Sequence, residues 1–135
     1  MGSINKIAVL YGGSSSEREI SLQSGLGVHK AILELGFESE LIDYRNIKDL
    51  RELKNFDFVF NALHGFEGEG GKLQQNLDDL KILYSGSCPE ACKNTWNKKF
   101  TKEILVRNKI RTPVSLDITF SKQIVENGLQ ANSFD

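Results

Sequence analysis

Three features are scarce in this sequence: long apolar runs, an excess of one charge, and cysteine. No apolar run approaches the ~20 residues that a membrane-spanning helix needs. The net charge is −1 and the isoelectric point is near 6.1, so no basic field predicts binding to nucleic acid or to an anionic membrane. The amino end lacks the basic and then apolar segments of a signal peptide, and Lys6 stands where a myristoylation site needs Ser or Thr. We therefore expect neither a nucleic-acid partner nor a membrane partner.

The two cysteines, Cys88 and Cys92, are four residues apart and have no histidine beside them. That is too sparse for a zinc site, and a disulfide framework would need more cysteines. Two half-buried free thiols in a reducing compartment fit better, so we expect a cytoplasmic protein. The sequence also has no Walker loop and no Ser-His-Asp motif, and His29 falls within a predicted helix where we expect it to face solvent.

The chain has 135 residues, of which 39% are hydrophobic and 26% charged, as in an ordinary globular domain. Apolar segments alternate with helical patterns, which predicts a parallel sheet with crossover helices in three layers, a Rossmann-like α/β fold. The predicted strands are residues 6–11, 38–43, 57–63 and 82–84. If their order is 2-1-3-4, the first and third strands flank the crevice where ligands bind. The predicted helices are residues 17–35, with an inward stripe ending at Leu35, residues 47–54, and a third helix that carries Leu73, Leu77 and Leu80 on one face.

We expect this α/β unit to occupy residues 1–86. A second unit, residues 87–135, begins with a helical turn at 88–94 and an amphipathic helix at 96–108. A strand at 114–120 and a weakly patterned segment at 121–135 follow. The pattern predicts only the start of this second domain, which the sequence does not complete.

The segment from Gly12 to Glu19 joins the first strand to the first helix, where α/β folds often bind phosphate. Ser16 and Glu19 have capping-box spacing, which predicts Ser16 as the N-cap and Glu17 as the first helical residue. Two carboxylates in the first turn would repel phosphate and could hold a cation such as an ammonium group. The alternative is that both glutamates only complement the helix dipole.

His64 follows the third strand and precedes a loop with four glycines in eight residues. The carboxyl ends of parallel strands meet at one edge of a sheet, so we expect Glu17 to face His64 there. A histidine bonded to a neighbouring carbonyl is the alternative. The lysines of the segment 98–102 lie near a helix start, where one could bind an anion, although solvated surface lysines explain the same pattern.

Four segments together resemble the D-alanine–D-alanine ligases. Residues 9–22, VLYGGSSSEREISL, are similar to the amino-terminal signature of that family. Ala62-Leu63-His64-Gly65, the following Gly68-Glu69 and Leu73-Gln74 are similar to its second motif, and Tyr84-Ser85-Gly86-Ser87 to its third. Asn97-Lys98, Thr101-Lys102 and Thr112-Pro113 resemble the start of its central domain. The resemblance runs in order from Lys6 to about Pro113 and is specific because the motifs occur jointly.

The resemblance implies an ATP-grasp enzyme of the bacterial cytoplasm, with this chain containing its pre-ATP-grasp domain. Such enzymes use ATP and Mg²⁺ to join two D-alanines into a cell-wall precursor. By motif position, Glu17 would bind the ammonium group of the first D-alanine, Ile20 would line the pocket for its methyl group, and His64 would orient its carboxyl group. Glu17 and His64 are thus the expected catalytic residues, and Lys98 would reach the phosphates of ATP.

Two positions depart from the family pattern. Asn97 replaces an aspartate, and Gly70 replaces the aspartate that we expect to cap the third helix. No residue after Pro113 resembles the nucleotide pocket or the Mg²⁺ ligands of the family. We therefore expect this chain to supply the first D-alanine site, to bind neither ATP nor Mg²⁺ tightly, and to be inactive alone. The family also implies a homodimer through the amino-terminal region. The alternatives are a non-catalytic dimerisation module or a small-molecule-binding α/β module that shares only the architecture.

Overall fold

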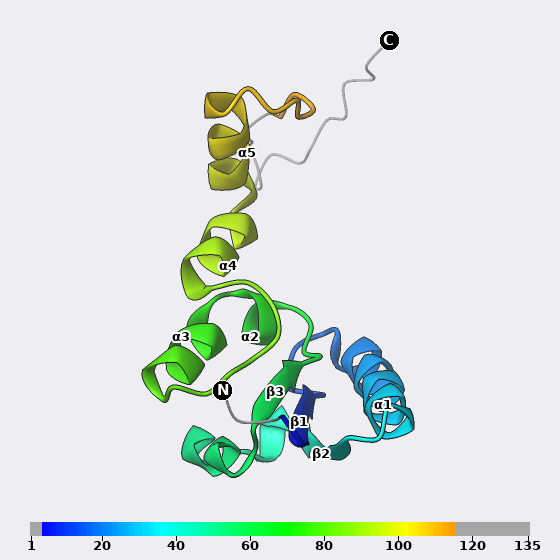
Figure 1. Ribbon diagram of the computed structural model, residues 1–135. Helices are drawn as coiled ribbons and strands as arrows, with labels where there is room; N and C mark the ends of the chain where they lie inside the picture. The colour runs from blue at the N-terminus through cyan, green and yellow to red at the C-terminus, as the bar shows by residue number, and fades with distance from the viewer. Residues whose placement is uncertain (1–3, 116–135) are drawn as a thin grey trace, which may run out of the picture.

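The computed structural model describes residues 4–115 and is organised around a parallel sheet of three strands. Strand β1 lies in the centre, with β2 on one side and β3 on the other, as Figure 1 shows. Their bounds are Lys6–Tyr11 for β1, Glu38–Asp43 for β2 and Phe58–Asn61 for β3. The predicted fourth strand is reduced to one parallel bridge between Val59 and Tyr84. The predicted strand order is confirmed.

Helix α1 (Arg18–Glu34) covers one face of the sheet. Its buried residues are Ser21, Gly25 and Ile32, and Ile32 packs against a cluster that includes Ile7 and Val9 of β1. Gly25 lies so close to the Tyr11 side chain that a Cβ would overlap it, so helix and strand need glycine at this contact. The prediction for Leu35 was wrong: it is the C-cap of α1 and is 73% exposed, because the helix ends before that turn of the stripe.

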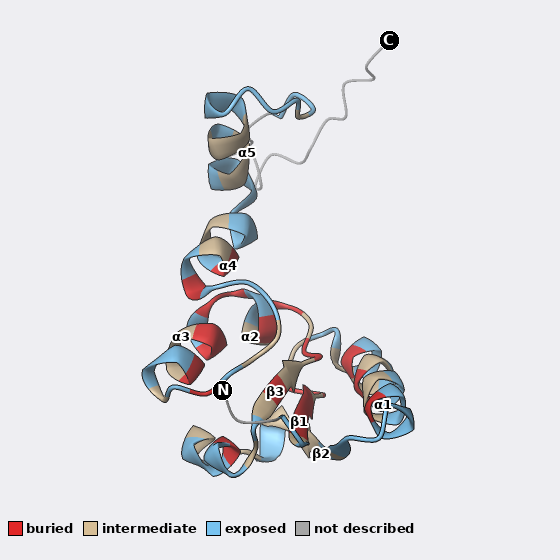
Figure 2. Ribbon diagram, viewed as in Figure 1, coloured by how far each residue is buried: buried red, intermediate tan, exposed pale blue. Residues whose placement is uncertain are grey.

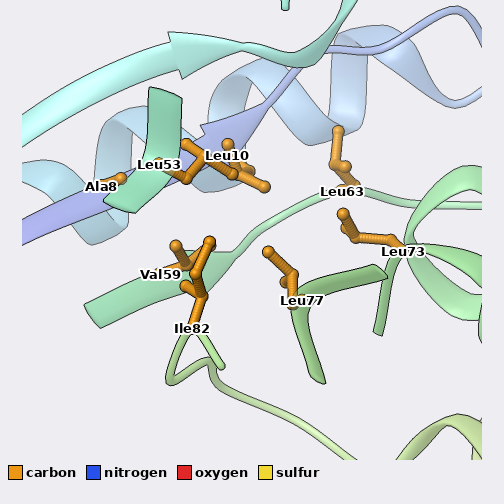
Figure 3. Close-up of a cluster of buried hydrophobic side chains, with 8 residues drawn as sticks. All are labelled: Ala8, Leu10, Leu53, Val59, Leu63, Leu73, Leu77 and Ile82. Carbon is orange, nitrogen blue, oxygen red and sulfur yellow. The ribbon is translucent and has the colours of Figure 1, made fainter. Parts of the chain in front are cut away.

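The opposite face of the sheet is covered by two 3₁₀ helices and two short α-helices. These are η1 (Tyr44–Asn46), η2 (Leu50–Asn55), α2 (Phe66–Glu69) and α3 (Lys72–Asp79). Figure 3 shows the buried cluster between these elements and the sheet, formed by Ala8, Leu10, Leu53, Val59, Leu63, Leu73, Leu77 and Ile82. The predicted three layers are confirmed. The helix predicted at 47–54 is instead the 3₁₀ helix η2, and η1 lies just before the predicted range. Each of the two 3₁₀ helices has an aspartate that accepts a hydrogen bond at its N-cap, Asp43 for η1 and Asp49 for η2.

Helices α4 (Pro89–Trp96) and α5 (Lys98–Arg107) extend away from the sheet, as Figure 1 shows. They correspond to the helical turn predicted at 88–94 and to the helix predicted at 96–108. Helix α4 packs against α2 and α3, whereas α5 packs against α4. No residue of α5 is buried (Figure 2). The strand predicted at 114–120 lies almost wholly outside the described residues, and the segment 121–135 lies outside them entirely.

The two cysteines belong to this second region. Both are free, but Cys88 is exposed and Cys92 is buried, so the prediction of two half-buried thiols was wrong in detail. Burial raises the pKa of the Cys92 thiol. None of the helices within residues 4–115 combines the length and the apolar content needed to cross a bilayer.

Candidate functional site

The loop between β1 and α1 presents three successive backbone N–H groups, and each donates to a side chain from a different element. Gly12 donates to Ser21 Oγ of α1 at 2.9 Å, and Gly13 donates to Asp43 Oδ1 of β2 at 3.3 Å. Ser14 donates to Glu67 Oε2 of α2 at 2.7 Å. Both glycines have positive φ angles, +76° and +73°, which favour residues without a side chain. Because all three donors are engaged and two of the acceptors are carboxylates, this loop is not a phosphate cradle.

The first residue of α1, Arg18, ties the start of the helix to the edge strand. Its guanidinium donates to both carboxylate oxygens of Asp43, at 3.0 and 2.6 Å, and to the carbonyl oxygen of Gly13 at 2.8 Å. Hydrogen bonding from Arg18 lowers the pKa of Asp43 to about 2. Sequence reasoning missed this pair. The signal was present, since Asp43 ends a strand that is parallel to the strand leading to Arg18, and such ends are neighbours.

The predicted helix cap was wrong by one residue. Helix α1 begins at Arg18 with Glu17 at the N-cap, and the exposed Ser16 makes no cap bond. Ser15 takes the bridging role instead, because its hydroxyl accepts the Glu17 N–H at 3.2 Å and donates to the His64 carbonyl at 3.1 Å. Only Glu19 therefore lies in the first turn. The Glu17 carboxylate is exposed and has no hydrogen-bond partner within residues 4–115.

The structure brings Glu17 and His64 to the same edge of the sheet. A Cβ added to Gly65, the residue after His64, would lie 3.1 Å from Glu17 Oε2. The half-buried His64 ring is held by a hydrogen bond of 3.1 Å between Nε2 and Ser24 Oγ. Glu17 therefore lies beside the His64 segment, whereas the expectation that the two side chains face each other, and their roles, remain predictions. His29 was predicted to face solvent and is instead half-buried, with Nδ1 2.8 Å from Ser39 Oγ.

The other two predicted site residues are both exposed. Ile20 is 53% exposed on α1, within one turn of Glu17. Lys98 begins α5 and borders a small cavity of about 230 Å³, whose other lining residues are Glu69, Thr95 and Trp96. None of the contacts in the described part of the chain joins Lys98 to Glu17 or His64. The short helix α2 lies between these two regions, since the Phe66 ring packs edge-on against Trp96 with the centroids 5.4 Å apart.

The glycine-rich segment after His64 makes close backbone contacts. The carbonyl of Gly68 accepts from Asn61 Nδ2 at 2.9 Å and from Gln74 Nε2 at 2.6 Å. A Cβ on Gly68 would lie 2.6 Å from the carbonyl oxygen of Leu63. The prediction that Gly70 replaces a cap of the third helix was wrong, because Gly71 is the N-cap of α3 and Gly70 ends α2.

Comparisons with known proteins agree with the motif resemblance. None of the protein-family models matches the chain. The chain is 45% identical over 112 residues to the D-alanine–D-alanine ligase of Bordetella petrii, which covers 82% of this chain and 34% of that protein. It is 49% identical over 110 residues to the D-alanine–D-alanine ligase of Moorella thermoacetica, covering 80% of this chain and 35% of that protein. The chain thus spans about a third of the length of these curated relatives.

The solved structures that resemble this chain are also D-alanine–D-alanine ligases. The D-alanine–D-alanine ligase of Bacillus anthracis complexed with ATP superposes with a TM-score of 0.75 at 31% identity, over 90% of this chain and 44% of that one. D-alanyl-alanine synthetase A of Vibrio cholerae gives a TM-score of 0.69 at 28% identity, over 82% of this chain and 39% of that one. These likenesses confirm the α/β fold class and the resemblance to the amino-terminal part of such ligases.

Proposed function

We propose that this chain is the amino-terminal, substrate-binding part of a D-alanine–D-alanine ligase, which joins two D-alanines in the bacterial cytoplasm to make a peptidoglycan precursor. The single observation that carries the proposal is the Glu17 carboxylate. It lies unpartnered at the start of α1, beside the His64 segment and next to a loop whose amide donors are already engaged. Such a carboxylate attracts a cation, and the similarity to D-alanine–D-alanine ligases supports the ammonium group of D-alanine as that cation.

Each residue of the proposed site has a chemical task. Glu17 accepts the N–H groups of the first D-alanine, and the exposed Ile20 offers an apolar surface to its methyl group. Ser24 fixes the Nε2 side of the His64 ring, so Nδ1 is left to contact the carboxyl group of the same substrate. Activation of that carboxyl group needs a phosphoryl donor, which ATP supplies when it is bound to the complete ligase.

The described residues fit only a small part of an ATP or Mg²⁺ site. Lys98 offers one exposed ammonium group to a phosphate, beside the carboxylate of Glu69. Residues 4–115 contain no cluster of three or more His, Cys, Asp or Glu side chains that could hold a metal ion. We therefore propose that the nucleotide and metal contacts come from polypeptide equivalent to the remaining length of the relatives, and that this chain alone does not turn over.

Binding of D-alanine tests the proposal directly. Titration of the ¹⁵N-labelled chain with D-alanine should shift the amide signals of the loop 12–17 and of His64, with weak affinity because part of the pocket is absent. Glu17→Gln should weaken binding about tenfold or more, since a charge-assisted hydrogen bond is lost. Glu19→Gln is the matched control, because Glu19 lies in the first turn of the same helix and complements the same dipole.

If Glu17→Gln and Glu19→Gln weaken D-alanine binding equally, Glu17 acts only by complementing the dipole of α1. If Glu17→Gln leaves the affinity unchanged, the chain binds a different small molecule. An assay of the chain with ATP, Mg²⁺ and D-alanine should release no phosphate. Robust turnover would contradict the proposal that the nucleotide and metal contacts lie outside this chain.

A homodimer is also part of the proposal, and exposed apolar side chains on and after α1 support it. Leu26 is 54% exposed, Leu33 49%, Leu35 73% and Phe37 40%. A group of such side chains is typical of a protein–protein contact. Sedimentation at increasing concentration should show a dimer, and Leu33→Glu should shift it to monomer. A wild-type chain that stays monomeric at high concentration would argue against dimerisation.

A further inference from the structure

The short helix α2 touches both regions that the proposed function needs. On one side, Glu67 Oε2 accepts the N–H of Ser14 at 2.7 Å, in the loop that leads to Glu17. On the other side, the ring of Phe66 packs against Trp96 at an interplanar angle of 63°. The two contacts come from neighbouring residues of one four-residue helix. A displacement of α2 would therefore change both contacts.

The contact of Glu67 with the loop is tightly fitted. Its carboxylate lies so close to Gly13 that a Cβ at that position would overlap it. Burial raises the pKa of the Tyr44 phenol, and the nearby charge of Glu67 raises it further, so the carboxylate lies close to a partly desolvated group. A hydrogen bond from a backbone N–H to a carboxylate is among the stronger ones in proteins. Glu67 thus holds the conformation of the loop between Gly13 and Glu17.

The contact of Phe66 reaches the start of α5. Trp96 ends α4, and Lys98 begins α5 after the single extended residue Asn97. The Phe66 ring also packs closely against the backbone of Gly70. A Cβ at Gly70 would lie only 2.6 Å from the nearest ring carbons, so this glycine limits the positions that the ring can take. The position of Trp96 therefore depends on α2, and the backbone of Lys98 follows two residues later.

We propose that α2 couples the two halves of the site, with Glu67 as the positioning residue for the loop that carries Glu17 and Phe66 as the positioning residue for the segment that carries Lys98. The identity of the ligand rests on the proposed function, but the coupling itself does not. Binding at Glu17 shifts the loop, the loop moves α2 through Glu67, and Phe66 transmits the movement to Trp96. Neither Phe66 nor Glu67 belongs to the motif residues that carry the sequence resemblance.

Trp96 is the only tryptophan of the chain, so its fluorescence reports on the far end of this path. Titration of the full chain with D-alanine should give a saturable change in Trp96 emission. In Glu67→Ala the emission change should be lost, whereas Glu67→Gln should restore it, because an amide oxygen can accept the Ser14 N–H. Glu90→Ala, which removes an exposed carboxylate from the first turn of α4, is the matched control and should respond as the wild type does.

A second measurement needs no ligand and separates the two proposals. In Glu67→Ala the Ser14 amide should exchange with solvent about tenfold faster, and the indole N–H signal of Trp96 should move. Unchanged Ser14 exchange and an unchanged Trp96 signal would overturn the coupling, whatever D-alanine does. If these ligand-free effects occur but D-alanine gives no amide shifts in the wild type, the coupling stands and the proposed substrate is wrong. Should Glu67→Ala fail to fold, Glu67→Asp keeps the charge but is one methylene too short to reach the Ser14 N–H, so Ser14 must exchange faster than in the wild type, and equal rates would refute the proposal.

Discussion

The α/β unit and the pair α4–α5 stabilise their helices in different ways. Helix α3 has eight residues and buries three of them against the sheet, whereas α5 has ten residues and buries none. An isolated helix shorter than ~12–15 residues is marginal in water, so α5 depends on contacts beyond its own turns. The α/β unit contains its own core, and α5 relies on α4 and on its caps.

Several apolar side chains of α4 and α5 are not covered by other residues of the described part of the chain. Trp96 is 42% exposed, Phe100 41% and Val106 65%. In the α/β unit, side chains of this kind close the two core clusters on either face of β1. Exposed apolar groups of this size are typical of contact surfaces. The difference between the regions agrees with the proposal that further polypeptide completes the ligase around α5.

The largest expected effect comes from truncating a core side chain of the α/β unit, and the same kind of truncation on α5 is the comparison. Leu77→Ala should lower the free energy of unfolding by about 2–5 kcal/mol, because Leu77 is fully buried and its truncation leaves a cavity. Val106→Ala should cost less than about 0.5 kcal/mol. Urea unfolding followed by circular dichroism measures both. Equal losses in the free energy of unfolding would show that α5 unfolds together with the core of the α/β unit, which would contradict the proposed difference between the two regions.

A smaller effect is expected at the clamp between α1 and β2. Asp43→Asn should cost about 1–2 kcal/mol at neutral pH, since Arg18 loses a charged partner that is only partly exposed. The pKa of Asp43 is lowered to about 2, so its contribution is complete above pH 4 and is lost as the pH falls towards 2. The stability difference between wild type and Asp43→Asn should therefore shrink over that range. A difference that is constant from pH 7 to pH 2.5 would contradict the ionic origin of the clamp.

A loss confined to one helix is expected at the cap of α5. The Asn97 side chain accepts the Phe100 N–H at 3.1 Å, so Asn97→Ala should destabilise this helix by about 1 kcal/mol. Hydrogen exchange should become faster in α5 and remain unchanged in α3, because the loss is local. Asn97→Asp keeps the acceptor and serves as the control. Faster exchange in α3 as well would show that the two regions unfold together.

Strand periodicity was sufficient to predict the centre of the fold. In β1 alternate residues belong to opposite clusters, with Ile7 and Val9 on the side of α1 and Ala8 and Leu10 on the other. The position of Glu17 beside the His64 segment also follows, because the loops that carry them leave the carboxyl ends of two neighbouring parallel strands, β1 and β3. These features depend on local pattern and topology, which the sequence carries.

Tertiary contacts decided the features that the sequence could not predict. Ser15 and Ser16 are equivalent in type, but only Ser15 reaches the His64 carbonyl, so Ser15 orders the start of α1. The glycine-rich segment gave no sign of a helix, yet α2 forms there because Gln74 and Asn61 hold the Gly68 carbonyl. The clamp between Arg18 and Asp43 joins residues 25 positions apart. Long-range hydrogen bonds of this kind leave no periodic signal.

The loop between β1 and α1 has a consequence for selectivity between substrates. Under the proposed function, the enzyme works in the presence of ATP, whose phosphates are the ligands that a glycine loop at a helix start ordinarily attracts. Ser21, Asp43 and Glu67 already occupy the amide groups that a phosphate would need. These side chains come from three separate elements, so no single substitution would open the loop to a nucleotide. Under the proposed function, these three side chains would keep the phosphates of ATP away from the loop beside the amino-acid pocket.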